Sequence, residues 1–179
     1  VNNNNIYIGN ISGVKNLNSV YVTELIESSQ FYKLDKILFI MDADYGDNNE
    51  SGFTRMEKSI TDIIKKIQEI KNIKTAYFIS PNNRDDGMIE NLLIEAMKCK
   101  KIKEYIKEEV VPEIRKMEDC EITKFSESKS IFMMIAATQS PMKGNASSFI
   151  TDCYKKLDKD NEYFKGIKNF ISKAIQNDS

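Results

Sequence analysis

Histidine and tryptophan are both absent from this chain of 179 residues. Without histidine there is no imidazole to bind a metal or to act as a general base, and catalytic triads that contain one are excluded. Without tryptophan the chain lacks the side chain that stacks most strongly on nucleobases. Any catalysis must therefore use carboxylates, lysines, hydroxyls or thiols.

Cysteine is also scarce, since Cys99, Cys120 and Cys153 lie far apart and form no CxxC pair. Such an odd, scattered set predicts reduced thiols in a cytosolic protein instead of a disulfide framework or a zinc site. No apolar run approaches the ~18–20 residues of a membrane helix, and residues 1–5 do not resemble a signal peptide. We therefore expect a cytoplasmic protein with no membrane partner.

An excess of charge of one sign is missing too. The 26 Lys and Arg residues nearly balance the 27 Asp and Glu residues, for a formal net charge of −1. This balance excludes a strongly basic protein that coats nucleic acid, although it leaves room for a local basic groove. With 41% hydrophobic and 30% charged residues at this length, we expect one globular domain that spans residues 1–179.

The first half of the chain alternates between strand and helix patterns. The run at 36–41 is apolar throughout, which is typical of a central strand whose sheet is covered by helices on both faces. The β-α-β-α-β order predicts a parallel sheet with right-handed crossovers. The expected strands are 6–8, 36–41 and 75–80, and the expected helices are about 19–29 and 56–70.

The second half is mostly helical, so we expect a core at about 1–95 and a helical extension at about 96–179 that packs on it. The expected helices are 88–118 with an interruption at Pro112, 129–138 and 164–175. Asn145 or Ser147 is expected to be the N-cap of a further helix.

Two aspartates, Asp42 and Asp44, directly follow the apolar run at 36–41. In open α/β sheets ligands bind outside the carboxyl ends of the strands, and residues i and i+2 of an extended chain point to the same side. Two carboxylates held together repel, so they share a proton or bind a divalent cation. With oxygen ligands and no histidine, Mg²⁺ or Mn²⁺ is the expected cofactor. The alternative is structural, with Asp42 capping the loop and Asp44 a solvated turn residue.

A second polar cluster, residues 80–90, follows the strand at 75–80 and should fall at the same edge of the sheet. It contains a Pro-Asn-Asn turn, a glycine and Glu90, which we expect in the first turn of a helix. Alone, Glu90 is also consistent with an ordinary helix start, where an acidic side chain favours the helix dipole. Together the two acidic loops predict Asp42, Asp44 and Glu90 as metal ligands and catalytic residues.

These motifs resemble a known fold. The β-α-β-α-β order with an Asp-x-Asp after its second strand resembles the Toprim fold of topoisomerases, bacterial primases and the overcoming-lysogenization-defect (OLD) nucleases. More narrowly, the chain resembles a Toprim-like family of uncharacterised bacterial proteins, the DUF3226 type. The resemblance implies a Toprim-like (Rossmann-like) α/β fold with a parallel sheet flanked by helices. Its motifs are the glycine turn before Asn16-Leu17, Phe39 to Asp44, and Pro81-Asn82-Asn83 with Gly87 to Leu93.

Toprim domains begin with a strand that carries a glutamate, and a helix follows it. Both come before the element that corresponds to residues 6–8. No such strand precedes Val1 in the sequence. The resemblance implies that this glutamate acts in acid–base chemistry or metal binding. We expect the strand either upstream of Val1 or lacking in this member of the family.

The leading functional hypothesis is Mg²⁺-dependent hydrolysis or transfer of nucleic-acid phosphodiesters at the three acidic residues. Lys98, Lys101 and Lys129 are the candidate contacts to phosphate. The alternative for the lysines between 98 and 107 is a solvated helix face, paired with Glu95, Glu104 and Glu108.

Two other functions stay open at this point. The first is a non-catalytic Toprim-like module used for binding or assembly. The second is a phosphatase of the haloacid dehalogenase type, whose nucleophile lies in a strand followed by Asp-x-Asp. The residues after Asp44 and the position of the strand in the chain weigh against that phosphatase.

Overall fold

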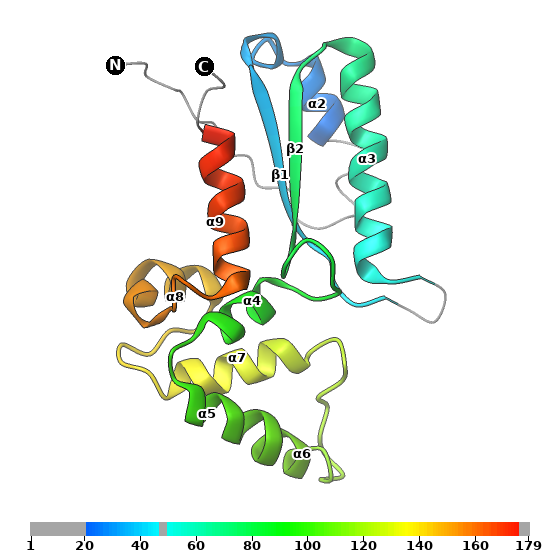
Figure 1. Ribbon diagram of the computed structural model, residues 1–179. Coiled ribbons are helices and arrows are strands. Elements are labelled where there is room, and N and C mark those ends of the chain that lie inside the picture. The colour runs from blue at the N-terminus through cyan, green and yellow to red at the C-terminus, as the bar shows by residue number, and fades with distance from the viewer. Residues whose placement is uncertain (1–20, 47–49, 176–179) are drawn as a thin grey trace.

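Two parallel strands form the sheet in the computed structural model, which describes residues 21–46 and 50–175 (Figure 1). Strand β1 (Lys36–Asp42) pairs with β2 (Lys74–Ser80) in a register that runs from Lys36 opposite Lys74 to Asp42 opposite Ser80. Both strands and their parallel pairing were predicted and are confirmed. The strand expected at 6–8 lies outside the described residues.

Helix α3 (Gly52–Ile70) makes the crossover between the two strands. Its N-cap is Ser51, whose hydroxyl accepts the Thr54 N–H, so the helix begins four residues before the expected start. Its apolar stripe faces the sheet and packs with α2 (Tyr21–Glu27) and the 3₁₀ turn η1 (Phe31–Lys33). The buried members of this layer include Phe31, Phe39, Met56, Ile60, Ile63, Ile67 and Ile79.

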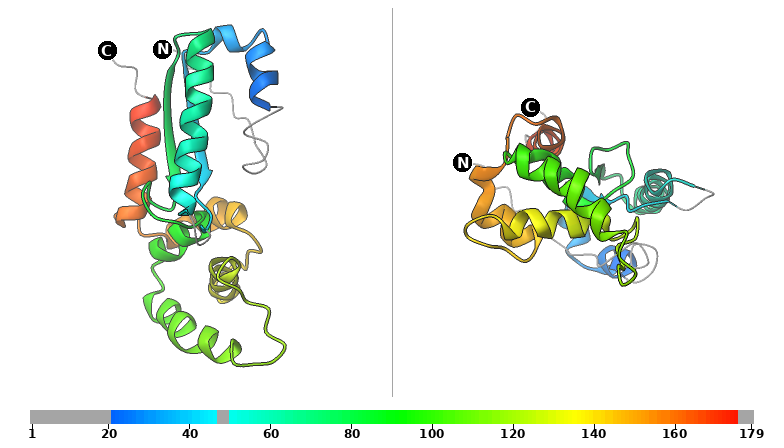
Figure 2. Two further views of the ribbon diagram at one scale, coloured as in Figure 1. Left: turned by 90° about the vertical axis from the view of Figure 1, so that its right-hand side faces the viewer. Right: turned by 90° about the horizontal axis from the view of Figure 1, so that it is seen from below.

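The opposite face of the sheet is covered by α9 (Glu162–Ile175), as Figures 1 and 2 show. Phe78 of β2 contacts Phe170 of α9, with ring centroids 5.8 Å apart. Ile40 lies opposite Phe78 in the register and is 46% exposed, because α9 packs on β2. The prediction that 36–41 is buried on both faces is therefore wrong for this position of β1.

Residues 89–156 form a helical layer at the carboxyl edge of the sheet (Figure 1). Its core contains Leu93, Phe132, Ile135 and Phe149, and the rings of Phe132 and Phe149 meet edge to face at 5.5 Å. The helices at 129–138 and 164–175 and the cap by Asn145 are confirmed. The elements are α4 (Ile89–Ala96), α5 (Lys100–Tyr105), the π-helical η2 (Ile106–Val110), α6 (Val111–Ile114), α7 (Glu127–Ala137), α8 (Ala146–Cys153) and the 3₁₀ turn η3 (Tyr154–Lys156).

The interruption expected at Pro112 is wrong, because the helical run continues through it into α6. The wider π-helical turn η2 precedes the proline and leaves room for its ring, which would otherwise clash with the preceding turn. The break falls instead at Met97, whose extended backbone forms a bridge with Leu157. Within the described ranges, no helix has the length and apolarity needed to cross a membrane.

We expect Ile63→Ala in α3 to lower the free energy of unfolding by about 2–5 kcal/mol, because the side chain is fully buried against the sheet. Ile70→Ala in the same helix should cost less than about 0.5 kcal/mol, since Ile70 is 49% exposed. Urea denaturation measures both changes. Equal losses in the two variants would contradict this assignment of the buried face.

Candidate functional site

The acidic residues singled out in the sequence lie at the carboxyl edge of the two strands. Asp42 is the last residue of β1, Asp44 follows it by two, and Glu90 lies in the first turn of α4. Parallel pairing places the ends of β1 and β2 side by side, and α4 begins just beyond β2. The structure therefore brings the three carboxylates to one edge, as the topology predicts.

Asp42 is half-buried at the end of β1. Its Oδ1 accepts the backbone N–H of Ile89 at 2.8 Å. Burial is the largest cause of a pKa of about 6 for Asp42, well above its ordinary value. The negative charges of Glu90 and Asp44 also raise this pKa, whereas the hydrogen bonds from the Ile89 N–H and the Ser80 side chain lower it. A nearby cation would relieve this repulsion and favour the ionised form.

Asp44 is exposed, and its backbone is held in the left-handed region at a φ of 57°. The extended backbone expected through Asp44 is therefore wrong, because β1 ends at Asp42 and the chain turns after it. The N–H of Asp44 donates to the carbonyl of Gly87, and the N–H of Gly87 donates back to the carbonyl of Asp44, both at 2.8 Å. Gly87 itself has a φ of 141°, which a residue with a Cβ adopts only under strain. The two acidic loops are thus joined backbone to backbone.

Asp86 joins the same loops through its side chain, a role that the sequence did not single out. One carboxylate oxygen accepts the N–H of Gly46 and the other that of Phe53, each at 2.9 Å. Burial opposes ionisation, but hydrogen bonds from Phe53, Gly52, Gly46 and the Ser51 side chain outweigh it, so the pKa of Asp86 lies below its ordinary value. Asp86 therefore fixes the loop after β1 to the start of α3.

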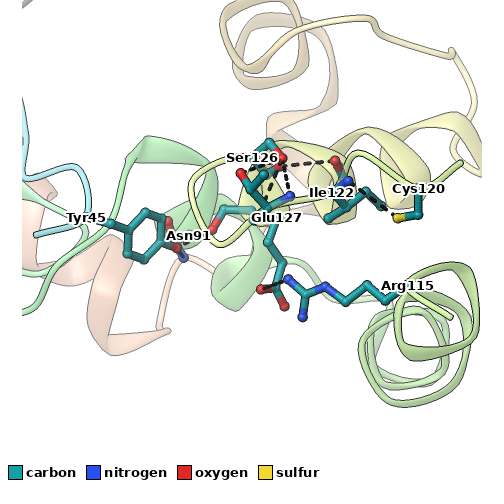
Figure 3. A network of polar contacts seen from close by, with 10 residues as sticks. Tyr45, Asn91, Arg115, Cys120, Ile122, Ser126 and Glu127 are labelled. Atoms are coloured by element: carbon teal, nitrogen blue, oxygen red, sulfur yellow. Dashed lines mark hydrogen bonds and ion pairs between the residues drawn. The ribbon is translucent and has the colours of Figure 1, made fainter. Parts of the chain in front are cut away.

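Tyr45 connects the loop after β1 to the helical layer (Figure 3). Its hydroxyl is 2.5 Å from the hydroxyl of Ser128 in α7 and accepts the side-chain N–H of Asn91 in α4 at 2.9 Å. Asn91 also accepts the N–H of Met88 at 2.8 Å. At the other end of this region, Arg115 donates to the carboxylate of Glu127 at 2.7 Å.

A cavity of about 330 Å³ opens beside this network, between the sheet edge and the helical layer. It is distinct from the acidic edge, because Asp42, Asp44 and Glu90 do not line it. Its wall includes Tyr45, Asp86, Asn91, Lys107, Ser128 and Tyr163.

A metal ion at the acidic edge would have oxygen donors alone. Among residues 21–46 and 50–175, no group of three or more Cys, Asp or Glu side chains is placed to hold a metal ion. Mg²⁺ usually takes only one or two carboxylates and completes its shell with water and substrate phosphate. The donor chemistry of Asp42 and Asp44 therefore fits Mg²⁺ in the presence of a phosphate ligand, and does not form a closed protein cage.

The three lysines predicted to contact phosphate lie in different places. Lys98 follows α4 and Lys101 lies in α5, whereas Lys129 lies in the first turns of α7. Lys103 and Lys107 both pair with Glu95, at 3.2 and 3.1 Å. Pairing with Glu95 is thus confirmed for two lysines of this face, but not for Lys98 or Lys101.

These features define a mixed α/β protein in which a parallel strand pair is flanked by helices and ends in two acidic loops. The chain belongs to the family described as "Protein of unknown function (DUF3226)", whose model matches residues 1–176. No curated protein and no solved structure matches the chain. The predicted membership of this family is confirmed, and the resemblance to Toprim domains and OLD nucleases stays a prediction.

We expect Asp86→Ala to lower the free energy of unfolding by about 1–3 kcal/mol, because several backbone N–H groups lose their acceptor. Asp85→Ala is the matched control: the side chain of Asp85 is 53% exposed, so the change should stay within about 0.5 kcal/mol. Urea denaturation measures both. Equal effects would mean that the bonds of Asp86 do not stabilise the fold.

Asp42→Asn should change the pH dependence of stability. The pKa of Asp42 in the folded chain, about 6, lies above the ordinary 3.8, so the folded state loses stability as pH rises from 4 to 6. Asparagine cannot ionise and still accepts the Ile89 N–H. The free energy of unfolding of the variant, relative to that of the parent, should therefore be up to about 3 kcal/mol higher at pH 7.5 than at pH 4. Urea denaturation at the two pH values measures this difference. A difference that does not change with pH would contradict the raised pKa.

Proposed function

We propose that this protein is a Toprim-like, Mg²⁺-dependent enzyme that acts on nucleic-acid phosphodiesters at the acidic edge of its sheet. The observation that carries the proposal is the grouping of Asp42, Asp44 and Glu90 beyond β1 and β2, with mutual repulsion that helps raise the pKa of Asp42. Carboxyl ends of parallel strands are where open α/β sheets bind ligands. Repelling carboxylates at such an edge favour a divalent cation.

Each residue has a distinct task in this proposal. Asp42 is held by the Ile89 N–H and serves as the fixed ligand, while the exposed Asp44 reaches toward solvent and substrate. Glu90 adds negative charge and is the candidate for proton transfer. Mg²⁺, when bound, supplies neutralisation of the phosphate charge and activation of a water molecule.

The loops that carry these carboxylates are held by bonds that do not depend on metal. The paired backbone bonds between Asp44 and Gly87 and the carboxylate of Asp86 keep the two loops in register. Such preorganisation lowers the cost of assembling a catalytic geometry. It supports an enzymatic use of the edge.

A non-catalytic binding module is the second candidate. Two observations favour it: no three-carboxylate metal group exists among the described residues, and one oxygen of Asp42 is already engaged by Ile89. In that case the acidic edge would contribute to assembly, and the protein would cleave neither DNA nor RNA with any divalent metal.

The test is titration of the full chain with MgCl₂ and MnCl₂ by calorimetry, together with cleavage assays on single- and double-stranded DNA and RNA. We expect millimolar Mg²⁺ binding that Asp42→Ala and Asp44→Ala each weaken at least tenfold, because each removes a ligand. Binding at pH 5 should be about tenfold weaker than at pH 7.5, since the Asp42 carboxyl with a pKa of about 6 is then mostly protonated.

Asp119→Ala is the control, because Asp119 is exposed in the segment between α6 and α7, far along the chain from the acidic edge. It should leave binding and cleavage unchanged. Metal binding without cleavage of any substrate would favour the binding module. If neither metal binds at about 10 mM and Asp42→Ala has no effect, both the metal site and the enzyme would be contradicted.

A further inference from the structure

The break at Met97 brings together two lysine-rich segments that are 57 residues apart in the sequence. The backbone N–H of Lys98 donates to the carbonyl of Lys156, and Lys98 Nζ donates to the carbonyl of Lys155, both at 3.0 Å. Figure 1 shows the chain passing from α4 to α5 beside the segment that joins α8 to α9. We call the resulting surface the lysine patch; it consists of Lys98, Lys100, Lys101, Lys155, Lys156 and Lys159.

The lysine patch carries positive charge that the surrounding carboxylates do not neutralise. In the part of the chain that the structure describes, none of its six lysines forms an ion pair with a carboxylate. The amine of Lys156 donates to the carbonyl of Ser140. Among the nearby acidic side chains, Glu95 pairs with Lys103 and Lys107, Asp152 with Lys143, and Asp160 with Lys165. Glu104 and Asp158 also lie in these segments, but two carboxylates do not cancel the charge of six lysines. The first turn of α5 contains no acidic residue.

Two exposed aromatic rings border this charge. Tyr105 lies one helical turn after Lys101 on the same side of the helix and is 63% exposed. Tyr154 is 45% exposed, and the amine of Lys159 lies 5.0 Å from the centre of its ring. Lysines that neutralise phosphates next to rings that stack on bases are the combination by which proteins bind single-stranded nucleic acid.

The patch and the acidic edge lie at the two ends of α4. Helix α4 begins beside Asp42, through the Ile89 N–H, and ends just before Lys98. Its eight residues span about 12 Å, a distance that a few nucleotides of one strand can cover. Lys129 is not part of the patch, because it lies near the start of α7 while Lys156 contacts Gln139 and Ser140, just beyond the end of that helix.

We propose that the lysine patch binds the phosphate backbone of a single nucleic-acid strand and directs it along α4 to the acidic edge. The identity of this partner as a substrate rests on the proposed function. The binding itself depends only on the patch and needs no metal.

The test is fluorescence anisotropy of a labelled 20-nucleotide single-stranded DNA with the full chain, in EDTA at several KCl concentrations. Replacement of Lys98, Lys101, Lys155 and Lys159 by Gln should weaken binding at least tenfold at low salt. It should also reduce the slope of log K against log [KCl] by about 3, since each lost phosphate contact on a single strand removes about 0.7. Inorganic polyphosphate, which has no bases to stack, should compete less well than unlabelled DNA of equal charge.

The matched control replaces four exposed lysines elsewhere, Lys33, Lys58, Lys65 and Lys66, by Gln and changes the net charge equally. It should alter the dissociation constant less than twofold, and circular dichroism should show both variants folded. Equal weakening in the two variants, no binding by the parent chain, or equal competition by polyphosphate would overturn the proposal.

The outcomes separate the patch from the acidic edge. DNA binding in EDTA that depends on the patch, without cleavage in Mg²⁺, would support the patch while the proposed enzyme fails. Cleavage in Mg²⁺ by a patch variant that binds DNA as tightly as the parent chain would support the enzyme and overturn the patch.

Discussion

The parallel pairing of β1 with β2 is the constraint on which the rest of the structure depends. Its register continues past the strands, because the N–H of Ala43 donates to the carbonyl of Ser80 at 3.1 Å. That bond directs the chain into the paired contact between Asp44 and Gly87, and from there into α4. A shift of one residue would turn Asp42 to the opposite face and bury a charge among the apolar side chains under α3.

Two carboxylates in the acidic loops, Asp42 and Asp86, have opposite environments. Asp86 accepts several hydrogen bonds and stays ionised at low cost, so it stabilises the loops. Asp42 is enclosed with other carboxylates nearby, which makes its ionised form unfavourable until a cation or proton arrives. Perturbed pKa values are concentrated at functional sites. A fold that keeps a destabilising carboxylate such as Asp42, as well as a stabilising one such as Asp86, is typical of such a site.

The net charge of −1 conceals a separation of charge along α4. Carboxylates gather at the start of this helix, and lysines gather beyond its end. The same helix carries Asn91, which joins Tyr45 and so links the acidic loop to the helical layer. Contacts made by one short helix therefore set the distance between the two surfaces that we propose for metal and for phosphate.

Local patterns in the sequence determined the strands at 36–41 and 75–80, the long amphipathic helices and the position of Asp42 and Asp44 at a strand end, because these features depend on periodicity and neighbouring residues. The tertiary structure decided the rest. The break at Met97 and the approach of Lys98 to Lys155 arise from a bridge to Leu157, which no local signal predicts. Likewise Asp86 and Ser128 gained their roles from partners far along the chain, since a side chain's hydrogen bonds depend on what the fold places beside it.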